Sequence, residues 1–233
     1  MFGVPKSELG SEAIQDYAKA IYSLERQDES GTVSTSALAD HLGITPGSAS
    51  AMVKRLAQRG LVTYEPYKGF SLTEEGTRMA LSVIRRHRLL ETFLHQELGM
   101  PWDRVHDEAE VLEHVLSSEL EDLIAAKLGH PTHDPHGDPI PTRDLLIAET
   151  ETVSLRDLEP GRRGTFVRIS DSDPAMLRYL GERDIVPGTE LQVIAHEPFG
   201  GPVVVRVAGV QHALGRLLAT AMRVEVADEE AAT

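Results

Sequence analysis

Residues 33–76 read VSTSALADHLGITPGSASAMVKRLAQRGLVTYEPYKGFSLTEEG, and this stretch decides the fold of the first third of the chain. Ser34 or Thr35 can cap a short helix that Gly43 closes. After a tight turn, a second helix opens at the PG pair and continues to Gln58. Two short strands, LVTYE and FSLT, follow around a PYKG turn. A helix-turn-helix followed directly by a hairpin predicts a winged helix.

The outer face of the second helix suits a DNA groove. Short hydroxyl side chains in its first turns can meet base edges or phosphates, and cations further along can meet phosphates. The same face could instead bind a protein, and DNA is the favoured interpretation of the two. The candidate contacts are Thr45, Ser48, Ser50, Lys54, Arg55, Arg59 and, at the tip of the hairpin, Lys68.

The distribution of charge supports DNA binding although the chain as a whole carries −14. From residue 45 to 88 there are eight basic and three acidic side chains, a balance of +5. From residue 103 to 159 there are fifteen acidic and four basic side chains, a balance of −11. A basic segment followed by an acidic one is typical of a DNA-binding module joined to a cation-binding module.

A second stretch, residues 87–114, gathers side chains of the metal-ligand type in the sequence HRLLETFLHQELGMPWDRVHDEAEVLEH. His87 and Glu91 are four residues apart. Glu110, Glu113 and His114 have helical spacing, with His106 one turn upstream, so we expect their oxygen and nitrogen atoms to converge on one face. The chain has no cysteine, so a metal here would be held by oxygen and imidazole nitrogen alone. Exposed ion pairs on helix surfaces are the plain alternative.

Two long helices, predicted over residues 73–98 and 103–128, are more apolar than one small domain requires. Surplus apolar helix surface indicates a homodimer, which would also suit a palindromic operator. Residues 129–143 hold four prolines and three histidines, and we expect a flexible loop there. From residue 153 onward, alternating apolar residues and two PG turns predict a small β-barrel with a helical patch at residues 174–180.

The order of these parts, with the motifs RRHRLLE, VHDEAEVLEH and HGDPIP, resembles the diphtheria toxin repressor family of metal-dependent transcription regulators. The resemblance implies a mainly α protein with a small β domain, in three parts. These are a winged helix-turn-helix over residues 1–75, a helical metal-binding and dimerisation domain over residues 76–145, and an FeoA-like, SH3-like barrel over residues 151–228. It implies a repressor that controls metal homeostasis genes. Because the sequence has no apolar run near eighteen residues and no signal-like N-terminus, we expect a soluble cytoplasmic protein without membrane spans.

The resemblance also implies two metal ions per subunit. The primary site would be Asp16, Glu110, Glu113 and His114, in which carboxylates stand where the iron branch has a methionine and a cysteine. Carboxylates favour Mn(II) over softer ions, so we expect the manganese-responsive branch, with Fe(II) as the alternative. Lys19 stands where the short manganese regulators have a second carboxylate, so their two-metal centre cannot be copied intact. The ancillary site would be His87, Glu91, His106 and Asp173, whereas Met176 stands where the iron branch has an amide.

Two other functions use the same residues. A dinuclear metal hydrolase would need these carboxylates and histidines, but the sequence offers no candidate nucleophile or glycine-rich substrate loop, and we expect no enzyme. A winged-helix regulator that answers a small ligand would bind DNA without metal. The two regulators can be distinguished by purifying the protein, because bound metal would indicate the metal-dependent one.

Overall fold

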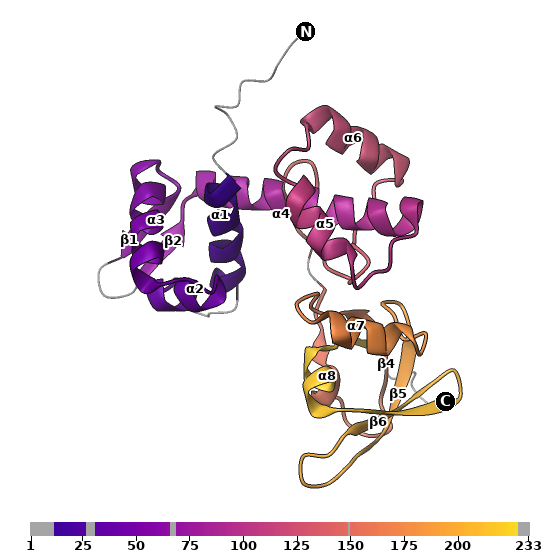
Figure 1. Ribbon diagram of the computed structural model, residues 1–233. Helices are drawn as coiled ribbons and strands as arrows, with labels where there is room; N and C mark the ends of the chain where they lie inside the picture. The colour runs from indigo at the N-terminus through magenta and orange to yellow at the C-terminus, as the bar shows by residue number, and fades with distance from the viewer. Residues whose placement is uncertain (1–11, 27–30, 66–68, 149, 228–233) are drawn as a thin grey trace. The chain divides into compact units, whose positions relative to one another are not determined.

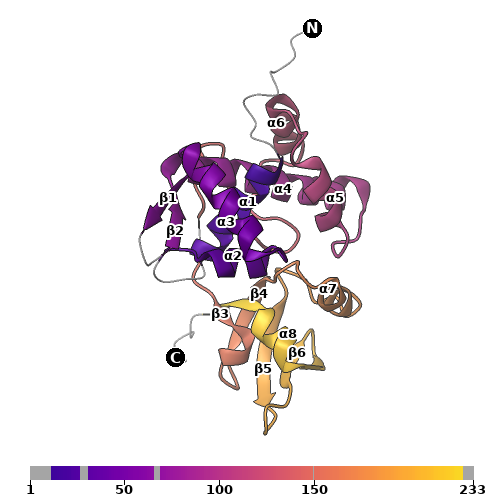
Figure 2. The ribbon, with the colours of Figure 1, turned by 60° about the vertical axis from the view of Figure 1, so that its left-hand side comes forward.

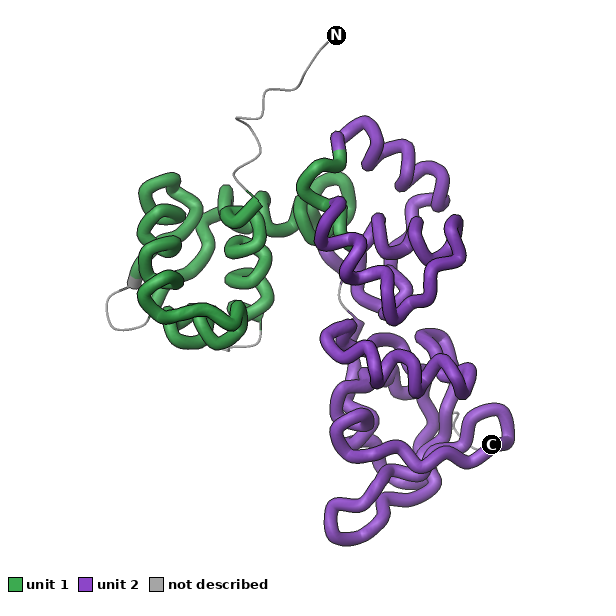
Figure 3. The backbone as a smooth tube through the Cα atoms, in the orientation of Figure 1, with its two compact units in different colours: residues 1–87, 113–116, 141–146 green, residues 88–112, 117–140, 147–233 purple. Residues whose placement is uncertain are grey.

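The structure, a computed structural model, describes residues 12–26, 31–65, 69–148 and 150–227. The chain divides into two compact units (Figure 3). The first contains residues 1–87, 113–116 and 141–146, and the second contains residues 88–112, 117–140 and 147–233. None of the helices in the described part of the chain combines the length and the apolar character that crossing a membrane requires.

The first unit begins as the predicted winged helix (Figure 1). Its elements are α1 (Glu12–Glu25), α2 (Thr35–His41), α3 (Pro46–Gln58), β1 (Val62–Glu65) and β2 (Gly69–Leu72). The strands β1 and β2 pair antiparallel, and Val33 adds a short bridge to Phe70. Gly69, at φ +130°, permits this bridge, because a Cβ atom there would lie 2.3 Å from the Val33 carbonyl oxygen.

The helices of this unit share one apolar core. Ile14 and Ile21 of α1, Leu38 of α2 and Leu56 of α3 are fully buried together with Phe70 of β2. The core therefore joins α1 to α3, so a restraint on α1 is passed to the helix that was predicted to face DNA.

The long helix α4 (Glu74–Leu98) is confirmed at the predicted place. The prediction of one helix over residues 103–128 is wrong, because the segment forms α5 (Val105–Leu112) and α6 (Ser118–Lys127) with a turn between them. Ser117 begins the second of these helices, since its side-chain oxygen accepts a hydrogen bond from the backbone N–H of Leu120 at 3.2 Å. Glu113 and His114 lie in the turn rather than on a helix face.

The C-terminal part of the second unit contains one six-stranded antiparallel sheet in the order β3-β8-β4-β5-β6-β7. Figure 2 shows this sheet with α7 and α8 beside it. The strands and helices are β3 (Val153–Ser154), β4 (Arg163–Arg168), α7 (Pro174–Gly181), β5 (Glu190–His196), β6 (Val203–Val207), β7 (Val210–Leu214), α8 (Arg216–Ala221) and β8 (Arg223–Val226). A short 3-10 turn, Leu155–Asp157, follows β3. The small β domain and its helical patch are confirmed.

Two phenylalanines of this domain provide a matched test of where its stability lies. Phe166 is fully buried in the sheet's core, whereas Phe199, between β5 and β6, is fully exposed. We expect Phe166→Ala to lower the free energy of unfolding of this domain by about 3–5 kcal/mol. Phe199→Ala should change it by less than about 0.5 kcal/mol. Denaturant unfolding followed by circular dichroism measures both, and equal effects would contradict the assigned core.

Candidate metal centre

Asp16, Glu113 and His114 form the first cluster of ligand atoms, and all three belong to the first unit. Each offers an oxygen or nitrogen within 4.8 Å of the others. His114 Nε2 lies 2.9 Å from Asp16 Oδ1, and its Nδ1 lies 2.8 Å from Gln15 Oε1. Residues that are almost a hundred positions apart therefore meet, because α1 presents two successive side chains to the turn that follows α5.

Glu113 is the buried acid of this cluster. Its Oε1 lies 2.8 Å from Lys19 Nζ, and its Oε2 lies 2.5 Å from His87 Nδ1. Burial by itself raises the pKa of the Glu113 carboxyl, but the hydrogen bond from His87 and the charge of Lys19 outweigh it. The net effect is a pKa below the ordinary value, so the side chain is a carboxylate ready to accept a cation.

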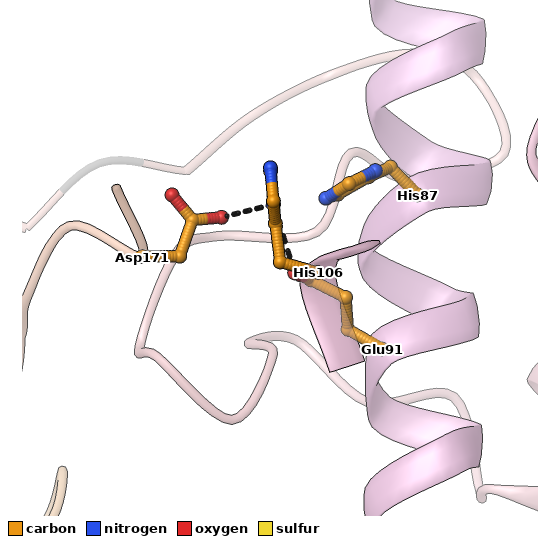
Figure 4. Close-up of side chains that lie close together, drawn as sticks. All are labelled: His87, Glu91, His106 and Asp171. Carbon is orange, nitrogen blue, oxygen red and sulfur yellow. Dashed lines mark ion pairs between the residues drawn. The ribbon is translucent and has the colours of Figure 1, made fainter. Parts of the chain in front are cut away.

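Glu91, His106 and Asp171 form the second cluster, in the second unit. Figure 4 shows the imidazole of His106 between the two carboxylates, with His87 one turn before Glu91 on α4. His106 Nδ1 lies 2.8 Å from Asp171 Oδ2 and 3.6 Å from Glu91 Oε1. The hydrogen bonds to Asp171 and Glu91 raise the pKa of His106 to about 10, despite the opposing effect of burial.

Glu110 lies at the edge of this second cluster. It is on α5, one turn after His106, and its Oε1 is 3.8 Å from His106 Nε2. Its side chain is 37% exposed, so it can still turn toward an ion. Glu110 belongs to the second unit, whereas Glu113 belongs to the first.

Asp173 was predicted as the ligand from the C-terminal domain, and the structure places it elsewhere. Its Oδ1 accepts hydrogen bonds from the backbone N–H groups of Ala175 and Met176 at 2.9 and 3.4 Å, so it is the N-cap of α7. Met176 packs against the apolar core of the domain. The carboxylate beside His106 is Asp171, two residues earlier. Because Pro174 occupies the first turn of α7, the residue before it is the expected cap, and this signal in the sequence pointed away from Asp173 as a ligand.

A third group, Glu91, Asp134 and His136, was missed because residues 129–143 were expected to be a flexible loop. All three are buried and lie within 4.8 Å of one another through their ligand atoms. His136 Nδ1 is 3.6 Å from Glu91 Oε1, and its Nε2 is 2.7 Å from the carbonyl oxygen of Trp102. Burial lowers the pKa of His136, but the hydrogen bond to Glu91 and the nearby acids outweigh it and raise it to about 9.

The loop is held in place by contacts that local spacing does not reveal. Arg88 of α4 donates a hydrogen bond to the Pro139 carbonyl oxygen at 2.6 Å and lies 3.3 Å from Asp138 Oδ1. Gly137, at φ +87°, packs so closely that a Cβ atom would lie 1.7 Å from the Val167 carbonyl oxygen. Close packing at a position that only glycine can occupy fixes the preceding residues Asp134 and His136 in place.

The predicted DNA contacts that the structure describes lie on α3 or at its two ends. Lys54, Arg55 and Arg59 are exposed. Thr45 is the N-cap of α3, since its Oγ1 accepts a hydrogen bond from the Ser48 backbone N–H at 3.2 Å. The remaining predicted contacts are Ser48, which is exposed, Ser50, which is half-buried, and Lys68, which lies outside the described residues.

The donors of the three groups are carboxylate oxygens and imidazole nitrogens only, a set that suits a borderline or hard divalent cation. Acidic side chains gathered at this density in buried or half-buried positions repel one another unless positive charge lies among them. The groups therefore fit a divalent metal ion in composition and spacing.

Comparisons with known proteins agree with this architecture. Three family models match in order: the iron dependent repressor N-terminal DNA binding domain over residues 10–70, the iron dependent repressor metal binding and dimerisation domain over residues 73–142, and the FeoA domain over residues 153–226. The iron-dependent repressor IdeR of Mycobacterium leprae is 30% identical over 90% of this chain and 95% of its own length. The diphtheria toxin repressor of Corynebacterium efficiens is 33% identical over 91% of this chain and 94% of its own length.

Solved structures add a second set of relatives. A manganese-dependent transcriptional repressor in complex with manganese has a TM-score of 0.84 and 43% identity, covering 92% of this chain and all of that one. The manganese regulator SloR has a TM-score of 0.72 and 29% identity, covering 92% of this chain and 98% of that one. The winged helix, the metal-binding and dimerisation domain and the FeoA domain define a metal-dependent DNA-binding transcriptional repressor, not an enzyme. The chain belongs to the diphtheria toxin repressor family.

The charge of Glu113 should stabilise the metal-free protein. Replacing it by Gln keeps the shape but leaves Lys19 and His87 facing a neutral amide, so we expect Glu113→Gln to lower the free energy of unfolding by about 1.5–3 kcal/mol. Glu108→Gln, at an exposed position of the adjacent helix α5, is the matched control and should change it by less than about 0.5 kcal/mol. Denaturant unfolding in buffer with a chelator measures both, and an unchanged midpoint for Glu113→Gln would count against the buried ion pairs.

Proposed function

We propose that this protein is a Mn(II)-activated repressor of metal-uptake genes that binds a palindromic operator as a homodimer in the cytoplasm, where the DNA lies. The observation that carries the proposal is the convergence of Asp16 with Glu113 and His114. One ligand lies on the first helix of the winged helix and two lie in the helical region. An ion held there would tie the DNA-binding part to the part that the family match assigns to dimerisation.

We further propose domain boundaries at residues 1–75, 76–145 and 151–228, and two ions per subunit. The three successive family matches support the boundaries. The primary ion would use Asp16, Glu113 and His114, with Glu110 turned toward it from α5. The ancillary ion would use Glu91, His106 and Asp171, with His87 contributing from one turn upstream on α4. Asp134 and His136 share Glu91 with this second group and are its additional candidate ligands.

The preference for Mn(II) rests on the donor set. Every candidate ligand is a carboxylate or an imidazole, and the chain has no thiolate to favour softer ions. The solved relative that is 43% identical is a manganese-dependent transcriptional repressor in complex with manganese. Fe(II) is the second candidate, because relatives at 30–37% identity include iron-dependent repressors and diphtheria toxin repressors.

The chain's own residues explain how occupancy of the primary metal site would affect DNA binding. When bound, the ion supplies positive charge that offsets the Asp16 and Glu113 carboxylates. Asp16 then holds α1 against the turn at His114, and the shared core of α1 and α3 passes this restraint to α3. The metal-bound protein then allows fewer arrangements of α3. Because the ion binds the DNA-competent conformation more tightly than the others, its binding shifts the population toward that conformation.

Metal should therefore control DNA binding. With a labelled duplex selected from a random pool by the Mn(II)-loaded protein, we expect Mn(II) to tighten binding roughly 5- to 150-fold over chelator-treated protein. Asp16→Ala should abolish this response, whereas Glu12→Ala, at an exposed position on the same helix, should preserve it. Fluorescence anisotropy with Mn(II) and, under anaerobic conditions, with Fe(II) measures which metal tightens DNA binding more. A DNA affinity that is unchanged by either metal and by Asp16→Ala would overturn the proposal.

A second test concerns the face of α3 that meets DNA. Lys54 is exposed on that helix, so Lys54→Ala should weaken binding to all duplexes alike and reduce the slope of log affinity against log salt by about one. Lys127→Ala removes a similar cation that pairs with Glu97 on the helical domain and should leave the slope unchanged. A slope that is insensitive to Lys54 would place the DNA on another surface.

A further inference from the structure

Lys19 lies in direct contact with the primary cluster, where it contributes a positive charge among candidate metal ligands. We propose that its ammonium group is a built-in counter-cation that limits this site to one divalent ion and lowers the affinity for that ion. The inference rests on the proposed function, since it assumes that Asp16, Glu113 and His114 hold a metal.

The position of Lys19 makes it part of the site. It follows Asp16 by three residues on α1, so the two side chains share one helix face. Lys19 Nζ is 2.8 Å from Glu113 Oε1, while the Asp16 carboxylate is 2.9 Å from His114 Nε2. The same helix face therefore presents an anion and a cation to the two adjacent residues of the turn.

The two oxygens of Glu113 already have partners before any metal arrives. Oε2 faces His87 at 2.5 Å, and Oε1 faces Lys19 at 2.8 Å with His114 Nε2 at 3.6 Å. An ion that uses Oε1 must share this atom with the ammonium group or displace it. A second divalent ion beside the first would be repelled by the same ammonium group at short range, where little water screens the charges.

An ordinary surface ion pair would not have this effect. Exposed pairs contribute little because water screens both partners, whereas the Glu113 side chain is fully buried and that of Lys19 is only 20% exposed. Loss of the Lys19 charge should therefore lower the stability of the metal-free protein and raise the affinity for the metal ion. It leaves a buried carboxylate with one cationic partner fewer in the metal-free protein, and it removes a competitor from the metal-bound protein.

Three substitutions separate this role from a merely structural one. Lys19→Leu removes the charge without adding a ligand, Lys19→Glu replaces the cation by a carboxylate, and Lys127→Leu is the control at the exposed pair with Glu97. We expect Lys19→Leu to lower the melting temperature of the metal-free protein by a few degrees while tightening Mn(II) binding on the order of tenfold. A structural role alone would weaken both.

Isothermal titration and equilibrium dialysis with MnCl₂ measure affinity and the number of ions. Lys19→Glu should bind one Mn(II) more than the unchanged protein, and its electron paramagnetic resonance spectrum should show two coupled Mn(II) ions. In an Asp16→Ala background, Lys19→Leu should leave the affinity for the remaining ions unchanged. Lys127→Leu should match the unchanged protein throughout.

The outcomes are distinguishable from a failure of the proposed function. If the unchanged protein binds no Mn(II), the proposed function fails and this inference fails with it. If it binds Mn(II) in an Asp16-dependent way but Lys19→Leu binds equally or more weakly, only the inference is overturned. If Lys19→Glu does not fold, the opposite changes in melting temperature and affinity expected for Lys19→Leu still decide it.

Discussion

Two buried carboxylates, Glu113 and Glu91, constrain how the segments of the chain meet, because a buried negative charge must have positive charge within reach. Both side chains are at most 1% exposed. Lys19 and His87 supply that charge to Glu113, and His106 and His136 supply it to Glu91. Each partner comes from a different segment, so the two acids draw the segments together. The histidines are also metal donors once their protons leave.

The elements of the fold could largely be predicted because their signals are local. The caps, glycines and apolar spacing between residues 33 and 76 decide the winged helix without help from the rest of the chain. The single helix expected over residues 103–128 failed for a non-local reason. Apolar periodicity continues through residues 113–117, but Glu113 and His114 bind residues of α1, and Ser117 caps a new helix. Contacts with distant residues outweighed the periodicity.

The candidate site was predictable to the extent that its residues share a helix or a turn. His87 with Glu91, and Glu113 with His114, were found by spacing and lie in the clusters described here. Asp171 was missed by two positions, although the proline after Asp173 marked that residue as a cap. Asp134 and His136 had no local signal, since their burial depends on Arg88, Trp102 and Val167, which lie far away in the sequence.

The helix α4 gives the two carboxylate systems a common support. His87 contacts Glu113, and Glu91, one helical turn later, contacts His106 and His136. One turn of α-helix is a rise of about 5.4 Å with little freedom to stretch, since each turn is held by its own backbone hydrogen bonds. The helix therefore fixes the spacing between His87 and Glu91, whichever side chains contact them.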